Sequence, residues 1–280
     1  MLMLPLIAAG LVAASPDTLL VTADWLAQHL ARPELVVVQV ERTRAPYDAG
    51  HIPGSRFLPL SAIVTEREGL PNELPTVAAL DSVMESLGIG DRGRVVVTGD
   101  PLAAARLFFT LEYLGLAGEV ALLDGGLAAW MRAGGALSAD APAFEHSTFT
   151  PKPEPGLLVE AGWVRRHLDD STVALLDARP PAEFAGGPSD GVPRPGHIPG
   201  ARSVYWRTLL DDAGRLHARD ELERRLQAEG AGKGDTVVAY CRTGVQASFV
   251  YFVSRYLGYV TRLYDGSFIE WSRTAEFPVE

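Results

Sequence analysis

The chain has 280 residues, of which 47% are hydrophobic, and its 25 basic and 35 acidic side chains give a net charge of −10. This length and apolar content suffice for two buried cores, and the negative balance argues against nucleic acid or an anionic membrane surface as a partner. The single cysteine excludes an intrachain disulfide and a cysteine-based zinc site, and we expect no metal or other cofactor.

The first residues, Met1 to Ala14, are uncharged and apolar, and small residues at 12–14 offer a cleavage point. This pattern is typical of a short signal peptide, although the segment lacks a starting lysine or arginine. It is too short for an ordinary transmembrane helix, and we expect no membrane span in the mature protein. Residues 1–18 are therefore expected to be a signal peptide or a leader. A signal peptide would make the protein periplasmic or secreted; otherwise it is cytoplasmic.

The rest of the chain repeats itself. Residues 19–26 (LLVTADWL) return at 157–164 (LLVEAGWV), and GHIPG occurs at 50–54 and at 196–200. An Asp-Gly pair and then a tryptophan follow in both copies, at 124, 125 and 130 and at 265, 266 and 271. The shared order indicates a tandem duplication. We expect domains at 19–140 and 157–280, joined by a linker at 141–156 that prolines keep extended.

Each half alternates short β-branched runs with helix-like stretches. The runs lie at 35–40 and 95–97 in the first half, and at 173–176 and 236–239 in the second. Such alternation predicts an α/β fold with mainly parallel sheets flanked by helices.

Cys241 directly follows the strand-like run at 236–240, and an apolar stretch that predicts a helix begins at residue 247. In a strand-to-helix loop, free backbone N–H groups favour a thiolate and any anion bound to it, which predicts a lowered pKa for Cys241 and a nucleophilic role. The alternative is a small buried hydrophobe. Gly244 and the cation of Arg242 favour the nucleophile.

Several motifs together resemble the rhodanese family, the tandem-domain thiosulfate and 3-mercaptopyruvate sulfurtransferases. They are a DAR box followed by an acidic residue (Asp177 to Arg179, then Glu183), GHIPGA at 196–201, the Cys-Arg-x-Gly loop at 241–244, and YDGS at 264–267 with Trp271 behind it. The resemblance runs from residue 19 to residue 280. It implies two rhodanese-like domains, the first catalytically inactive and the second carrying the cysteine.

The first half fits that division. When residues 94–98 are aligned with 236–240, Gly99 stands where Cys241 stands and Asp100 replaces Arg242. The first half therefore lacks the nucleophile, and the charge beside it is reversed.

The resemblance implies transfer of a sulfur atom from a small anionic donor through a Cys241 persulfide, without a metal. Arg242 favours thiosulfate as the donor, whereas the pair Arg179 and Arg194 resembles the 3-mercaptopyruvate type. A third reading is a non-enzymic persulfide carrier or thiol sensor. The expected acceptor is cyanide or a thiol, thioredoxin included, and family members of this size suggest a monomer.

The resemblance also assigns roles around the cysteine. The backbone amides of the loop would hold the anionic persulfide; its residues are Arg242, Thr243, Gly244, Val245 and Gln246. Arg179 would bind the donor with Asp177 orienting it, or the two would form a purely structural pair. Arg194 would be a second donor-binding arginine or a solvated loop residue.

Two further residues near the motifs are expected to have structural roles, and one related activity is excluded. His197 and Asp265 have counterparts in the inert half, His51 and Asp124, so we expect them to maintain turns and the fold. A related phosphatase loop would need an arginine six positions after the cysteine, where this chain has Ala247, so phosphatase or arsenate reductase activity is not expected.

Overall fold

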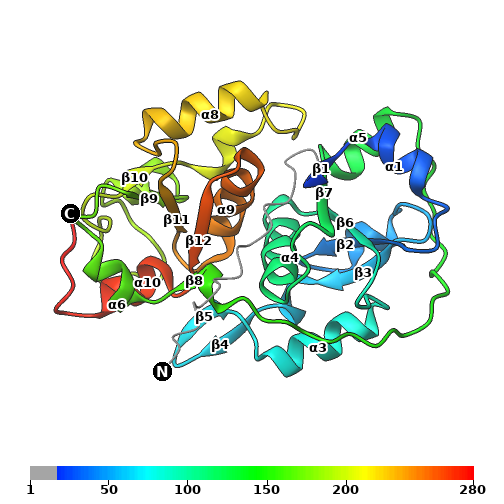
Figure 1. Ribbon diagram of the computed structural model, residues 1–280, viewed down its shortest axis with the longest axis horizontal. Coiled ribbons are helices and arrows are strands. Elements are labelled where there is room, and N and C mark those ends of the chain that lie inside the picture. Colours follow the sequence, from blue (N-terminus) through cyan, green and yellow to red (C-terminus); the bar gives the residue numbers. More distant parts are fainter. Residues whose placement is uncertain (1–17) are drawn as a thin grey trace, which may run out of the picture.

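A computed structural model describes residues 18–280, so the predicted signal peptide or leader lies almost entirely outside the described residues. The described chain forms two α/β halves that lie side by side, each with a parallel sheet flanked by helices (Figure 1). The predicted fold class is confirmed. None of the described helices is long and apolar enough to cross a membrane.

The first half contains a five-stranded sheet in which every neighbouring pair is parallel. Its strand order is β1 (Leu20–Val21), β7 (Val120–Leu123), β6 (Arg94–Gly99), β2 (Leu35–Glu41) and β3 (Arg56–Pro59). The helices of this half are α1 (Ala23–His29), α2 (Ala45–Asp48), α3 (Val77–Ser86), α4 (Pro101–Tyr113) and α5 (Gly126–Arg132). A two-stranded hairpin, β4 (Thr65–Arg67) and β5 (Leu70–Glu73), follows the short 3₁₀ helix η2 (Leu60–Ala62).

The second half repeats this topology. Its parallel sheet has the order β10 (Arg202–Ser203), β9 (Val173–Asp177), β11 (Thr236–Tyr240), β12 (Val260–Tyr264) and β8 (Leu158–Val159). Its helices are α6 (Ala161–Arg166), α7 (Pro181–Phe184), α8 (Arg219–Ala228), α9 (Val245–Leu257) and α10 (Ser267–Arg273), with 3₁₀ turns η3 (Pro155–Leu157) and η4 (Trp206–Leu209). Strands β2, β6, β9 and β11 are largely buried because apolar side chains lie on both of their faces.

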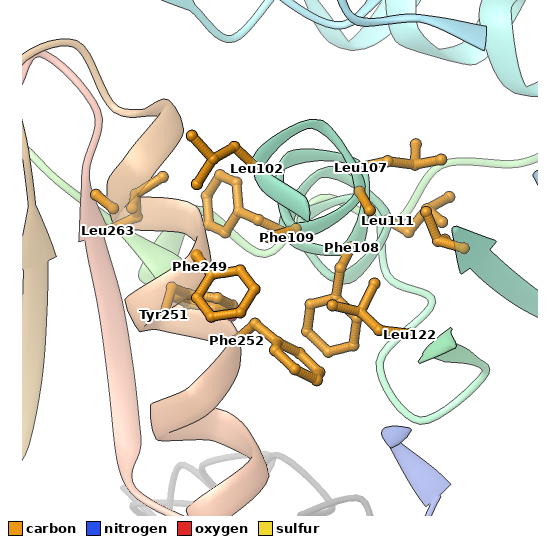
Figure 2. Packing of buried hydrophobic residues seen from close by; sticks show 14 of the residues in the cluster. Leu102, Leu107, Phe108, Phe109, Leu111, Leu122, Phe249, Tyr251, Phe252 and Leu263 are labelled. Carbon is orange, nitrogen blue, oxygen red and sulfur yellow. The ribbon is translucent and has the colours of Figure 1, made fainter. Parts of the chain in front are cut away.

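Helices α4 and α9 join the two halves through one continuous apolar core (Figure 2). Phe108 meets Phe252, and Phe109 meets Tyr251, each pair edge to face with ring centroids 4.9 Å apart. Each such buried ring contributes about 1.5–3 kcal/mol of transfer free energy. A buried Glu112 carboxylate on α4 accepts hydrogen bonds from Tyr251 and Arg255 on α9. The halves are therefore packed as one body.

The segment 141–154, most of the predicted linker, contains no helix or strand and runs along the first half. Phe149 is buried there, and the backbone N–H groups of Lys152 and Glu154 donate to carbonyls at the end of α4. The connection is thus docked along its length.

Candidate active site

Cys241 lies at the carboxyl end of β11, the central strand of the second sheet, and is 1% exposed. This end of a parallel sheet is where ligands of open α/β folds bind. The start of α10 holds the loop by hydrogen bonds. The Cys241 N–H donates to Ser267 Oγ at 3.2 Å. The Phe268 and Ile269 N–H groups donate to the carbonyls of Cys241 and Arg242, respectively.

The loop directs backbone N–H groups at the sulfur of Cys241. The groups that favour the thiolate belong to Ala247, Thr243 and Gln246. Burial nevertheless outweighs them and raises the pKa of the Cys241 thiol, and the nearby Asp177 carboxylate acts in the same direction. The predicted lowering of the pKa is therefore wrong, because a sulfur with almost no solvent contact loses more hydration than three amides replace.

Helix α9 begins two residues earlier than the sequence suggested. Val245 and Gln246 were expected in the loop but form the first turn of the helix. Gly244 caps that turn with φ at +84°, and a Cβ there would lie 2.5 Å from Asp265 Oδ1. Only glycine fits this position, so the loop is shaped against Asp265.

Arg242 is the exposed cation of the loop. Its side chain is 37% exposed, and its one ion pair, to the fully exposed Asp190, is 3.5 Å long. A pair of this kind is weak and screened by water, so the guanidinium can meet an incoming anion.

Arg179 does not face the loop in the way the resemblance implied. It is fully buried, its Nε and Nη2 donate to the Asp177 carboxylate, and Nη2 also donates to the Gly196 carbonyl at 2.8 Å. The guanidinium also lies 4.1 Å from the centroid of the Phe268 ring. These contacts favour the alternative of a structural pair beneath the loop, although Nη1 of Arg179 makes no hydrogen bond to the described residues.

Arg194 is also a structural residue. Its guanidinium donates to four backbone carbonyls at and beyond the carboxyl end of α10, those of Trp271, Ser272, Thr274 and Phe277. These bonds satisfy the free carbonyls that every helix end exposes. All three guanidinium nitrogens donate to these carbonyls, which favours a structural role over donor binding for Arg194.

The two histidines of the repeated turn make matching contacts. His51 Nδ1 lies 3.0 Å from the Tyr47 carbonyl with the rings stacked at 3.8 Å, and His197 Nδ1 lies 3.0 Å from the Phe184 carbonyl with the same stacking distance. Because the first half, which lacks a cysteine, makes the same contact, the structural role expected for both histidines is supported.

Asn72 is a site residue that the sequence analysis missed. It lies on β5 of the first half, with φ at +64°, and its Nδ2 donates to Thr243 Oγ1 at 2.9 Å. Its carbonyl accepts from Arg106 at 2.7 Å. No sequence signal marks it, because its partner is 171 positions away and in the other half.

In the first half, the position equivalent to the Cys241 loop is filled by the protein itself. A Cβ at Gly99, where φ is +114°, would lie 2.2 Å from the Val40 carbonyl oxygen, so no side chain fits there. Asp100 Oδ1 accepts the Leu102 and Ala103 N–H groups at 3.0 and 2.9 Å. The carboxylate thus fills the helix terminus that could otherwise hold an anion.

The chain is similar to known sulfurtransferases over almost its whole length. The family model described as a rhodanese-like domain matches twice, at residues 22–133 and 160–274. The chain is 32% identical to the 3-mercaptopyruvate sulfurtransferase of Escherichia coli, covering 94% of this chain and 98% of that protein. It is 31% identical to the thiosulfate sulfurtransferase of Pseudomonas aeruginosa, covering 94% and 97%.

A solved structure shows a similar fold. It is an EanB variant in complex with ergothioneine covalently linked with a persulfide cysteine, and it superimposes with a TM-score of 0.83 at 26% identity, covering 93% of this chain and 69% of that one.

Proposed function

The chain belongs to the rhodanese family of sulfurtransferases, and we propose that it moves the outer sulfur of thiosulfate to a thiophilic acceptor through a persulfide on Cys241. The observation that carries the proposal is the set of N–H groups from Thr243, Gln246 and Ala247 around the only thiol of the chain. The matching position of the first half holds Gly99, which assigns sulfur transfer to the second half alone.

The chemistry requires two displacements at sulfur. The Cys241 thiol loses its proton to solvent, and the thiolate attacks the outer sulfur of thiosulfate. A new S–S bond forms, the old one breaks, and its electron pair leaves with sulfite. The acceptor, such as cyanide, then attacks the outer sulfur of the persulfide, which releases thiocyanate and restores the thiolate. Negative charge resides on sulfur both in the Cys241 thiolate and in the persulfide. The loop amides lie beside that charge, so they stabilise both states without rearrangement.

Thiosulfate is favoured because one exposed cation remains from the three predicted arginines. Arg194 directs all of its guanidinium nitrogens at the protein and Arg179 directs two of its three there, which leaves Arg242 as the exposed cation for the donor. A cation directly after the cysteine, beside the loop amides, suits the compact thiosulfate dianion. The Escherichia coli relative, a 3-mercaptopyruvate sulfurtransferase, favours the second candidate donor, 3-mercaptopyruvate.

The proposal extends to partners and location. A thiol such as that of thioredoxin, or cyanide, would accept the sulfur, and the chain would act as a monomer. It would act in the periplasm or outside the cell if Met1 to Ala14 is a signal peptide, and in the cytoplasm otherwise.

The direct test is the intact mass of the purified protein before and after thiosulfate, and then after cyanide. We expect a gain of about 32 Da, one sulfur atom, that cyanide removes and that Cys241→Ser lacks. A mass gain from 3-mercaptopyruvate but not from thiosulfate would make 3-mercaptopyruvate the donor. A gain retained by Cys241→Ser would overturn the mechanism, and a persulfide that turns over slowly with every small acceptor would indicate a carrier.

A further inference from the structure

Arg106, on helix α4 of the first half, is a buried cation that the mechanism above does not use. It is fully buried, and its Nη1 and Nη2 donate to the two carboxylate oxygens of Asp265 in the second half at 2.6 and 3.1 Å. Nη2 also donates to the carbonyl of Asn72 on the β4–β5 hairpin at 2.7 Å. One guanidinium therefore holds two separate segments, and both of them contact the Cys241 loop.

The first route from Arg106 to the loop passes through Asn72. The bond from Arg106 fixes the backbone of Asn72, whose Nδ2 donates to Thr243 Oγ1 at 2.9 Å. Asn72 has φ at +64°, which non-glycine residues rarely adopt, so its conformation depends on such surrounding contacts. A shift of its carbonyl would move its side chain away from Thr243, whose N–H lies at the sulfur of Cys241.

The second route passes through Asp265. Its Oδ1, which Arg106 binds, would lie 2.5 Å from a Cβ at Gly244, so the carboxylate is the wall against which the loop turns. Two residues further on, Ser267 has φ at +54°, and its Oγ accepts the Cys241 N–H at 3.2 Å. The place of the carboxylate thus affects both the turn at Gly244 and the segment that holds the backbone of Cys241.

The matching position of helix α9 does not carry a cation. The alignment that places Gly99 opposite Cys241 places Ser248 opposite Arg106. Ser248 is also buried, but its Oγ donates to the nearby carbonyl of Gly244. Burying a cation costs desolvation free energy that its partners must offset. The chain carries this cost at the loop that has a thiol, and not at the loop without one.

We propose that Arg106 is a positioning residue that holds the Cys241 loop, through Asn72 and Asp265, in the shape that sulfur transfer requires. This inference rests on the proposed function and gives the first half a part in the reaction. Lysine cannot replace Arg106, because an ammonium lacks the planar fork that binds two carboxylate oxygens and a carbonyl in fixed directions. Loss of the fork should let the loop move although the charge is kept.

The test compares Arg106→Lys with Glu112→Gln in the full chain. Glu112 lies on the same helix, is also fully buried, and pairs with Arg255 of the second half at 3.1 Å, so it is the matched control for a weakened interface. We expect Arg106→Lys to lower kcat with thiosulfate and cyanide about tenfold and to change KM little, because the loop amides are displaced from the charge they stabilise. Glu112→Gln should leave kcat unchanged.

A second readout does not depend on sulfur transfer. Amide hydrogen exchange, followed by mass spectrometry, should become about tenfold faster at residues 241–247 in Arg106→Lys and should stay unchanged there in Glu112→Gln. Asp265→Asn keeps the side-chain volume and weakens the same ion pair. It should lower kcat and speed exchange at 241–247 as well, so it supplies both readouts if Arg106→Lys fails to fold.

The two readouts separate this inference from the proposed function. Faster exchange at 241–247 in Arg106→Lys, together with no sulfur gain by the wild type from any donor, would refute sulfur transfer and leave the hold of Arg106 on the loop supported. An unchanged kcat in folded Arg106→Lys or Asp265→Asn, or equal effects of Arg106→Lys and Glu112→Gln on kcat and on exchange, would overturn the positioning role.

Discussion

Asp124 and Asp265 hold equivalent positions in the two halves, and each accepts a backbone hydrogen bond from the opposite half. Asp124 Oδ1 accepts the Leu216 N–H at 3.0 Å, and Asp265 Oδ2 accepts the Leu74 N–H at 2.8 Å. The repeated Asp-Gly motif therefore builds a two-fold clamp between the domains. Only the Asp265 side of the clamp also contacts an active loop, through Gly244.

The clamp is not energetically symmetric. Asp265 also binds Arg106, which is fully buried, whereas Asp124 has the exposed Arg215 nearby. We expect Asp265→Ala to lower the free energy of unfolding by about 3–5 kcal/mol, because it leaves a buried cation unpaired. Asp124→Ala should cost about 1–2 kcal/mol. Urea denaturation of both variants measures the difference; equal losses would contradict it.

The raised pKa of Cys241 predicts the pH dependence of sulfur loading. The attacking species is the thiolate, and its fraction increases as pH rises toward a pKa that burial has lifted above the ordinary thiol value. The rate of single-turnover persulfide formation should therefore rise about tenfold per pH unit, without a plateau below about pH 8.5. A plateau at neutral pH would show that the loop amides outweigh burial.

Arg194 and Arg242 should respond in opposite ways to truncation. Arg194→Ala removes the bonds that satisfy the end of α10 and should cost about 2–3 kcal/mol of stability while leaving the KM for thiosulfate unchanged. Arg242→Ala should raise that KM about fivefold and leave the melting temperature unchanged. Steady-state kinetics and thermal melts of the two variants measure these effects. A raised KM for Arg194→Ala with unchanged stability would make Arg194 a donor-binding residue.

Asn72 of the first half should position the Cys241 loop of the second half. Asn72→Gly keeps the positive φ but removes the bond to Thr243, and we expect kcat/KM to fall about fivefold. Glu68→Gly is the matched control, because Glu68 also has a positive φ in the same hairpin and is exposed. A double-mutant cycle with Thr243→Val should show that the two losses are not additive; additive losses would exclude a functional contact.

Gly99→Cys should not create a second nucleophile. The new Cβ would meet the Val40 carbonyl at 2.2 Å, so we expect a stability loss of roughly 2 kcal/mol or more. Combined with Cys241→Ser, the variant should gain no sulfur from thiosulfate by intact mass. Persulfide formation at position 99 would show that the first half lacks only a thiol.

The sequence by itself determined the duplication, the α/β class and the candidate cysteine, because these depend on local signals. Strand composition, the repeated GHIPG and Asp-Gly motifs, and the thiol between a strand and a helix are all readable within a few residues of one another. The absence of a nucleophile in the first half also followed from one aligned position, Gly99.

Only the tertiary structure decided which groups the arginines contact and in which direction burial shifts the pKa of the thiol. Motif position places Arg179 and Arg194 near the site, but the carbonyls and carboxylate that occupy their guanidinium groups are brought there by folding. Asn72 likewise reaches Thr243 only because the two halves pack together. The pKa of Cys241 depends on burial, which is a property of the packed chain and not of the loop sequence, and there burial prevails over the amides.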